Sequence, residues 1–216
     1  MTNQKNQNLV PFLEIDENAL KELIPQGMVR AYPKGSVVIH AGDLSDSLYV
    51  ILSGRVKVFM SDESGKEFVL SEIGPGDYFG EVALDGGPRT ASIMVQDACR
   101  CFVIPKVEVK ALIEHHPDFA CNLIGRLIRK VRSLSDSVRN LALMSVYCRL
   151  LKFIDEQAVK REDGSLATER LTQQEIAMRI GASREMVSRL LTDLANCGYI
   201  SIESKRVVVH KALPDR

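Results

Sequence analysis

This sequence of 216 residues has no long apolar run. It also has no net charge, because 28 Lys and Arg balance 28 Asp and Glu. No segment reaches the roughly 20 apolar residues that a membrane-spanning helix needs. The N-terminal stretch MTNQKNQNLV is polar and lacks the apolar core of a secretory signal. These absences predict a cytoplasmic globular protein with no membrane partner.

Cysteine is scarce and scattered. The five cysteines are odd in number, and only Cys99 and Cys101 lie close together. Structural metal and iron–sulfur sites need several thiolates or imidazoles at tight spacings, and disulfides are rare in a reducing compartment. We therefore expect neither a metal site nor a disulfide, and we expect the cysteines to be packed, inert thiols.

The zero net charge hides a difference between the two parts of the chain. Residues 1–120 hold 11 Lys and Arg against 17 Asp and Glu, a balance of −6, and residues 121–216 hold 17 against 11, a balance of +6. A zero total argues against a nucleic-acid partner, but phosphate contacts depend on the local field. The basic C-terminal part keeps nucleic acid open as a partner.

Short strands separated by glycine turns dominate the first part of the chain. The runs GSVVIHAGD, DSLYVILSGRVKVFM, KEFVLSEIGPGDYFG and TASIMVQDACRCFVIP are rich in Val, Ile, Phe and Tyr, and SDESGKE separates two of them as a hairpin turn. Strands at this spacing predict an antiparallel roll or barrel. KVEVKALIEHH then predicts a short helix.

From Pro117 the apolar period changes to that of a long helix. Its apolar residues alternate spacings of three and four, with Ile124, Val131 and Val138 at heptad position a and Leu127, Leu134 and Leu141 at position d. β-Branched residues at a with Leu at d favour a parallel two-stranded coil. We therefore predict a homodimer interface on this helix; a single helix packed on its own roll is the alternative.

The most specific stretch is LTQQEIAMRIGASREMVSRLL, at residues 171–191. Thr172 and Glu175 form a capping box that begins a helix, Gly181 suits the left-handed turn that ends it, and Ser183 caps the next helix. Apolar residues of the second helix face inward, whereas Arg184, Glu185, Ser188 and Arg189 share an outward face. Beyond Cys197, YISIESKRVVVHK predicts a β-hairpin wing.

This order of caps, turn and wing is typical of a helix-turn-helix, whose second helix presents its N-terminal side chains to the major groove. Arginine can bond bidentately to guanine, and glutamate can accept from cytosine N4. The alternative is a helical hairpin with a charged, solvated face. The whole chain thus predicts an α+β protein with a roll at residues 1–116, a dimerisation helix at 117–144 and a winged helix-turn-helix at 145–216.

A second stretch, FGEVALDGGPRTASI at residues 79–93, has two interpretations. Glu81 and Asp85 could be the acid and base of an enzyme. Alternatively, Arg89 could hold a phosphate while Glu81 holds a sugar. No nucleophile–base pair or metal set accompanies the two carboxylates, which favours the phosphate cradle.

Both stretches resemble parts of one known family. TQQEIAMRIGASREMVSRLL resembles the helix-turn-helix of the CRP/FNR superfamily of transcription regulators, and FGEVALDGGPRTASI resembles the phosphate-binding cassette which that superfamily shares with other cyclic-nucleotide-binding domains. The long helix from Pro117, whose heptad a and d residues form the predicted dimer seam, and the segment LALMSVYCRLLKFI fit the same plan. The resemblance therefore covers nearly the whole chain. It implies a homodimeric DNA-binding regulator that is not an enzyme and that a small ligand in the β-roll controls.

The resemblance also assigns ligand contacts. In the family a Gly-Glu pair and an Arg hold the ligand, which implies that Glu81 accepts from a ribose 2′-hydroxyl and Arg89 pairs with the cyclic phosphate. A phosphodiester anion needs a fork-shaped cation and N–H donors. The implied ligand set is Gly80, Glu81, Val82, Ala83, Arg89, Thr90 and Ser135.

One implied contact departs from the family pattern. Family members that bind cyclic AMP reach the adenine with a Thr-Ser pair on the long helix, and the matching residues here are Leu134 and Ser135. Leucine cannot hydrogen-bond a base. We expect cyclic AMP as the effector, with cyclic di-GMP or an empty cassette as alternatives. If the cassette is empty, we expect Arg89 to pair with Glu81.

In the predicted winged helix-turn-helix at residues 145–216, which we call the DNA reader, the family's base-contacting positions match Arg184, Glu185 and Arg189. This set implies a palindrome of two TGTGA-like half-sites, one for each protomer. The phosphate-contact candidates are Ser183, Ser188, Lys205 and Arg206. A polar loop at residues 160–169 lies where family members contact RNA polymerase, although its sequence departs from that surface. A constitutive DNA-binding regulator and a phosphodiester-processing enzyme stay open as alternatives.

Overall fold

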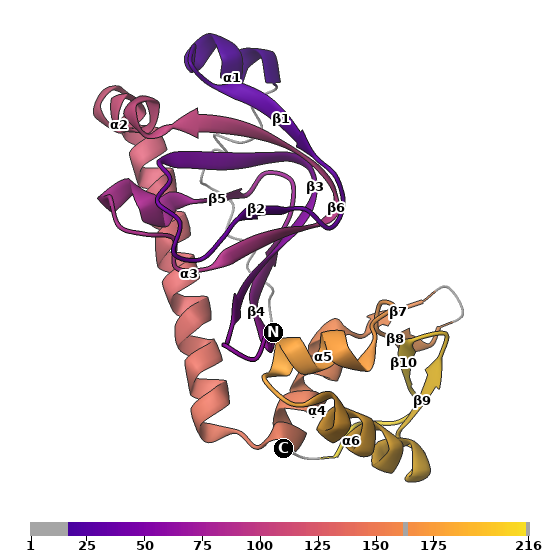
Figure 1. Ribbon diagram of the computed structural model, residues 1–216. Helices are drawn as coiled ribbons and strands as arrows, with labels where there is room; N and C mark the ends of the chain where they lie inside the picture. The colour runs from indigo at the N-terminus through magenta and orange to yellow at the C-terminus, as the bar shows by residue number, and fades with distance from the viewer. Residues whose placement is uncertain (1–16, 162–163, 215–216) are drawn as a thin grey trace. The chain divides into compact units, whose positions relative to one another are not determined.

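The computed structural model of the protein describes residues 17–161 and 164–214 (Figure 1). The chain divides into two compact units. The first is made of the described residues up to Met60 together with Leu70–Arg132, and the second of Ser61–Val69 together with the described residues from Ser133 on. The long helix contributes to both units, so the predicted boundaries after residues 116 and 144 stay a prediction.

An antiparallel sheet dominates the first unit. Its strands are β1 (Met28–Tyr32), β2 (Val37–Ile39), β3 (Ser47–Ser61), β4 (Glu67–Ile73), β5 (Tyr78–Phe79) and β6 (Ser92–Pro105). The order is β1-β6-β3-β4, with β2 also paired to β6 and β5 to β3. The long strands β3 and β6 curve strongly (Figure 1), and their register shifts between Ile51 and Val56. The predicted β-roll is confirmed.

The interior of the roll fixes the strand that leads into the phosphate cradle. Phe79 of β5 is 1% exposed, and its ring stacks on Tyr49 of β3 with ring centroids 4.8 Å apart. Burying an aromatic side chain of this size stabilises the fold by about 1.5–3 kcal/mol. The residues that follow Phe79 therefore start from a rigid base.

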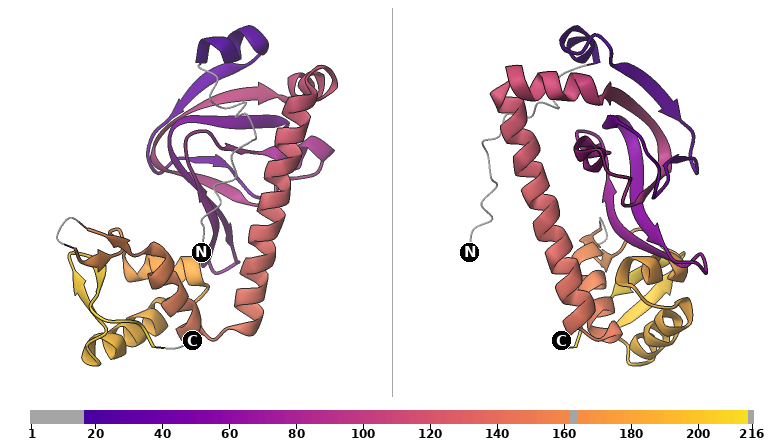
Figure 2. Two further views of the ribbon diagram at one scale, coloured as in Figure 1. Left: turned by 180° about the vertical axis from the view of Figure 1, so that it is seen from behind. Right: turned by 60° about the vertical axis from the view of Figure 1, so that its left-hand side comes forward.

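Among the described residues, three α-helices belong wholly or in part to this unit: α1 (Glu17–Leu23), α2 (Lys106–His115) and α3 (Pro117–Leu143). The chain turns sharply between α2 and α3 (Figure 2), where Pro117 suits the first position of a helix. Along α3, Phe119 and Leu123 are buried, but the six predicted seam side chains are between 36% and 65% exposed. A continuous apolar stripe left open in this way indicates a partner surface.

The second unit contains α4 (Val146–Gln157), α5 (Gln173–Ile180) and α6 (Arg184–Asn196) beside a small sheet. The sheet has the order β7-β8-β10-β9, with β7 at Val159–Lys160, β8 at Leu166–Ala167, β9 at Ile200–Glu203 and β10 at Arg206–Val209. The predicted wing is the β9–β10 hairpin. Leu150, Ile154, Ile176 and Val187 lie in the core that these helices share.

The prediction of a polar loop after α4 is wrong for part of its length. Ala167 pairs with both Val159 and Val208, so β7 and β8 extend the wing to four strands. The turn between β7 and β8 is closed by a bond from Arg161 N to Ser165 O at 2.8 Å. Pairing with the neighbouring strand β10 stabilises the extended backbone of β8 despite the polar composition of this segment. Residues 162 and 163 lie outside the described part.

The expectation of packed thiols holds for some cysteines. Cys99 and Cys101 are buried with their sulfurs 3.4 Å apart, and burial raises the pKa of both thiols. Cys121 and Cys197 are exposed, so the expectation is wrong there. Within the described residues, no helix is long and apolar enough to cross a membrane, and no three His, Cys, Asp or Glu side chains gather as metal ligands.

Candidate functional site

The phosphate cradle begins where β5 ends. Gly80 has a φ of 91°, and a Cβ placed there would lie 2.8 Å from Ser47 O and 2.9 Å from Arg89 Nη1. Only glycine accepts both the left-handed backbone and this close approach. A short 3₁₀ helix, η1 (Glu81–Asp85), follows and leads through a glycine turn to Arg89. The chain thereby brings Gly80 and Arg89 together across the cradle.

Arg89 is the most unusual side chain of the cradle, because it is a cation that is only 4% exposed. Its guanidinium donates to Ser47 O at 2.8 Å, to Ser45 Oγ from both Nε and Nη2, and to Gly80 O. These acceptors are neutral oxygens. Burial lowers the pKa of Arg89, because the charged guanidinium has been taken out of water.

Glu81 does not bind Arg89. The side chain of Glu81 is only 11% exposed, and its carboxylate accepts a hydrogen bond from Lys130 Nζ of α3 at 2.9 Å. The expected pairing of Arg89 with Glu81 is therefore not seen in this structure, where Glu81 pairs with Lys130. Lys130 of α3 is the cation that pairs with Glu81. The guanidinium of Arg89 instead donates to backbone carbonyls and to Ser45 Oγ.

Two further contacts join α3 to the same turn. Tyr78 Oη donates to Leu123 O at 3.2 Å, and Arg126 Nη1 lies 2.6 Å from Asp77 Oδ1. Burial raises the pKa of Tyr78, whose ring also lies beneath Lys130 at 5.0 Å. Sequence reasoning had missed this face of α3, although its spacings of three and four were a signal.

The other predicted ligand residues lie as follows. Asp85 Oδ1 accepts from Gly87 N at 2.7 Å, so Asp85 stabilises the turn instead of facing Glu81 as a catalytic partner. Thr90 is exposed and Val82 is 39% exposed; the side chain of Ala83 lies outside the described part. Ser135 is exposed on α3, in the portion that belongs to the second unit.

The predicted caps of the helix-turn-helix are confirmed. Thr172 Oγ1 accepts from Glu175 N at 3.1 Å and Glu175 Oε2 accepts from Thr172 N at 2.6 Å. Burial opposes ionisation of Glu175, but these bonds from Thr172 outweigh it and lower the pKa. Gly181 ends α5 with a φ of 65°, and Ser183 Oγ accepts from Met186 N to begin α6.

The predicted DNA contacts fall on the surface of the second unit. Arg184, Glu185 and Arg189 are exposed along the first turns of α6. Lys205 is exposed in the wing turn with a φ of 66°. Ser188 is half-buried, and so is Arg206, which donates to Thr168 O at 2.9 Å. The exposed cations of α6 and the wing are free to meet phosphates and bases.

Two family models match the chain over separate ranges. The model described as a cyclic nucleotide-binding domain matches residues 29–116. The model described as a Crp-like helix-turn-helix domain matches residues 148–212. The first range contains the cradle with Arg89 and Glu81, and the second contains α5, α6 and the wing.

Relatives match across almost the full length. A CRP-like cAMP-activated global transcriptional regulator of Mycobacterium tuberculosis (strain ATCC 25618 / H37Rv) is 33% identical over 203 residues, covering 92% of this chain and 91% of that protein. The cAMP-activated global transcriptional regulator CRP of Pasteurella multocida is 34% identical over 189 residues, covering 84% and 90%.

Solved structures show the same fold. A c-di-GMP-responsive global regulator of Xanthomonas campestris superposes with a TM-score of 0.80 at 23% identity, over 91% of this chain and all of that one. A CRP/FNR-family regulator of Thermus thermophilus has a TM-score of 0.67 at 25% identity, over 85% and 94%. Because the two relatives that are 33% and 34% identical match most of both chains, the chain belongs to the CRP/FNR family of transcription regulators.

Proposed function

We propose that the protein is a homodimeric transcription regulator whose binding to double-stranded DNA is controlled by a cyclic nucleotide held in the cradle. The buried guanidinium of Arg89 carries the ligand half of this proposal. A cation that is 4% exposed donates its hydrogen bonds to neutral oxygens, so none of those bonds is to an anion, and a cyclic phosphate supplies an anionic acceptor. Charge-assisted bonds of this kind are about twice as strong as neutral ones.

The remaining ligand residues have distinct tasks. Glu81, held by Lys130, accepts from the ribose 2′-hydroxyl, whereas Gly80 and Thr90 leave space and donors for the phosphate. Val82 and Ala83 belong to the proposed ligand set, and Ser135 contacts the base. Leu134 offers no hydrogen bond at the neighbouring position. We favour cyclic AMP as the effector, with cyclic di-GMP as the alternative.

The dimer interface is the exposed apolar seam of α3, formed by Ile124, Leu127, Val131, Leu134, Val138 and Leu141. Its a and d residues suit a parallel pair of helices. A two-fold dimer presents two α6 helices to successive major grooves of a palindrome. Ligand at Glu81 and Arg89 shifts the equilibrium between two dimer geometries, which changes how well both readers fit the DNA.

In the reader, Arg184, Glu185 and Arg189 contact bases of a TGTGA-like half-site, and Ser183, Ser188, Lys205 and Arg206 contact phosphates. Residues 160–169 are the proposed contact with RNA polymerase, of which 162 and 163 lie outside the described part. We place the protein in the cytoplasm, as the regulator of a gene and not as an enzyme. The domain plan, with a roll at residues 1–116, a dimerisation helix at 117–144 and a DNA-binding domain at 145–216, stays a prediction.

Calorimetry with cyclic AMP and cyclic di-GMP tests the ligand half. We expect the Arg89→Gln variant to bind at least about 30-fold more weakly, because bonds to charged groups contribute about 1.5–3 kcal/mol each. Arg30→Gln, which removes an exposed arginine of β1, is the matched control. No heat with any nucleotide would favour the constitutive regulator, and hydrolysis of the nucleotide would favour an enzyme.

Fluorescence anisotropy with a TGTGA palindrome tests the DNA half, and sedimentation velocity tests the dimer. We expect DNA affinity to rise when the effector is present. Absence of binding in both conditions contradicts the DNA reader, and equal binding in both contradicts the ligand switch.

A further inference from the structure

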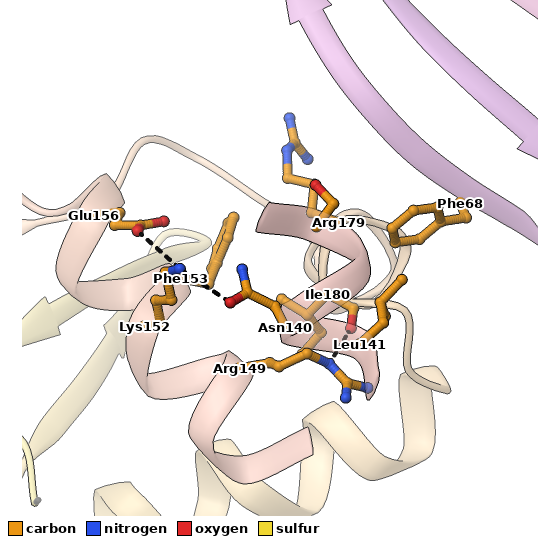
Figure 3. A pocket seen from close by; sticks show the side chains of 10 residues that line it. Phe68, Asn140, Leu141, Arg149, Lys152, Phe153, Glu156, Arg179 and Ile180 are labelled. Atoms are coloured by element: carbon orange, nitrogen blue, oxygen red, sulfur yellow. Dashed lines mark hydrogen bonds and ion pairs between the residues drawn. The ribbon is translucent and has the colours of Figure 1, made fainter. Parts of the chain in front are cut away.

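Arg149 of α4 makes three contacts that the ligand and DNA sites do not use. Its Nε donates to Ile180 O at 2.8 Å, its Nη2 to Gly181 O at 3.3 Å and its Nη1 to Met144 O at 2.7 Å. Figure 3 shows its guanidinium beside Ile180 and Leu141. All of these residues belong to the second unit.

The three acceptors share one property: each lies at the end of a helix. Ile180 is the last residue of α5, Gly181 is its cap, and Met144 directly follows α3. Helix ends leave backbone carbonyls without partners and carry partial negative charge. One guanidinium therefore satisfies the ends of two helices, and its planar fork holds them in a fixed geometry.

Packing at the same place reinforces this arrangement. A Cβ added to Gly181 would lie 2.8 Å from Leu141 Cδ2 and 3.4 Å from Phe68 Cε2. Leu141 belongs to the last turns of α3, so the turn of the helix-turn-helix lies directly against that helix. A pocket of about 100 Å³ opens beside these residues, with Arg149 along its wall.

The other two cations of this pocket bond differently. Lys152 reaches side-chain oxygens, Asn140 Oδ1 at 3.3 Å and Glu156 Oε1 at 3.7 Å. Arg179 donates to Glu175 O of its own helix α5 at 3.3 Å and lies 3.9 Å from Glu169 Oε1. Arg149 is the cation that joins the end of α3 to the turn before α6.

We propose that Arg149 is a positioning residue that fastens the helix-turn-helix turn to the end of the dimerisation helix, so that movement of α3 is passed to α6. The inference rests on the proposed function. α3 carries Lys130 against Glu81 near its middle and ends at Leu143. Arg149 then links Met144 to Ile180 and Gly181, immediately before Ser183 begins α6.

The test compares DNA affinity with and without saturating cyclic AMP in three variants. Coupling of this kind is typically 5-fold to 150-fold. The quantity compared is the ratio of DNA affinity with cyclic AMP to DNA affinity without it. We expect Arg149→Lys, which keeps the positive charge but loses the forked guanidinium, to reduce this ratio at least about 5-fold below that of the wild type. Arg149→Gln should reduce it further. Arg179→Gln, with the same charge change in the same pocket, should keep the ratio within about 2-fold.

A wild-type ratio in folded Arg149→Lys would overturn the proposal. A purely structural role would lower the melting temperature but leave the ratio unchanged, so thermal unfolding is recorded for every variant. If Arg149→Gln fails to fold, the ratio of Arg149→Lys decides.

Hydrogen exchange gives a second readout that needs neither ligand nor DNA. Met144 N donates to Asn140 O and Ala182 N to Ala177 O, so these amides report on the two helix ends. We expect Arg149→Lys to speed amide exchange at both helix ends together. If exchange becomes faster at only one end, or at neither, Arg149 does not hold the two ends together. If the wild type lacks ligand-dependent DNA binding, the proposed function fails, while this measurement still decides the role of Arg149.

Discussion

Lys130 of α3 holds Glu81 of the cradle, with 2.9 Å between Nζ and Oε1. The long helix that bears the dimer seam is thus bonded to the residue that we assign to the ribose. Lys130 Nζ also lies 3.4 Å from Tyr78 O, so one ammonium contacts both the backbone and the carboxylate of this turn. A ligand that engages Glu81 therefore acts on a group that α3 already holds.

A double-mutant cycle tests this link. We expect Lys130→Gln to weaken nucleotide binding about 5-fold to 10-fold, because Glu81 loses the cation that orients it. In the Glu81→Gln background the same change should cost less, which gives a coupling of about 1 kcal/mol. Calorimetry measures the four affinities. Arg132→Gln, an exposed change on the same helix, should bind like the wild type; full additivity in the cycle would contradict the link.

Tyr78 offers a prediction about stability. Tyr78→Phe removes the bond from Oη to Leu123 O and should lower the free energy of unfolding by about 1 kcal/mol. Thermal unfolding should show a melting temperature about 2–4 °C lower. An unchanged melting temperature would mean that solvent replaces the bond at no cost.

The pH dependence of that variant has a defined sign. Burial raises the pKa of Tyr78 above its ordinary value of 10.0, so the folded protein keeps the phenol neutral while the unfolded chain ionises it. The stability advantage of the wild type over Tyr78→Phe should be full below about pH 10 and should shrink as pH rises above that value. Chemical denaturation at pH 8 to 11 checks this, and a constant difference would contradict it.

Gly181 can be compared with a glycine of the same backbone geometry. Gly181 and Gly198 have φ of 65° and 70°, but a Cβ meets Leu141 at 2.8 Å only at Gly181, since nothing lies within 4 Å of Gly198. We expect Gly198→Ala to cost about 1–2 kcal/mol for the left-handed backbone, and Gly181→Ala to cost more. In a Leu141→Ala background the excess should vanish. Equal costs at both glycines in the parent chain would refute close packing at the turn.

The sequence predicted those features that depend on local chemistry. The capping box at Thr172, the glycine turn at Gly181 and the N-cap at Ser183 follow from the needs of helix ends, and the structure has all three. The buried strands of the roll follow from their composition.

Contacts between distant parts of the chain escaped sequence reasoning. Lys130 and Glu81 are 49 positions apart, and their pairing depends on how α3 lies against β5. The heptad seam drew attention to one face of α3, while Leu123, Arg126 and Lys130 occupy the adjacent face. The three acceptors of Arg149 are backbone carbonyls, which no side-chain pattern marks.

Two cations of the reader should differ in what their loss does to DNA binding. Arg184, exposed at the start of α6, is proposed to contact a base, so Arg184→Gln should cost about 1–3 kcal/mol per half-site and relax the preference at one base pair. Lys205, exposed in the wing turn, is proposed to contact phosphate. Lys205→Gln should weaken binding to all sequences alike and reduce the salt slope by about 1.

Anisotropy titrations against palindromes substituted at each position, at several salt concentrations, separate these two effects. Both variants lose one positive charge, so a difference between them cannot come from net charge. If Arg184→Gln weakens every palindrome by the same factor, Arg184 contacts the backbone of the DNA and another residue of α6 reads the bases. If Lys205→Gln alters the preferred sequence, the wing reaches into a groove, because a phosphate contact carries no sequence information directly.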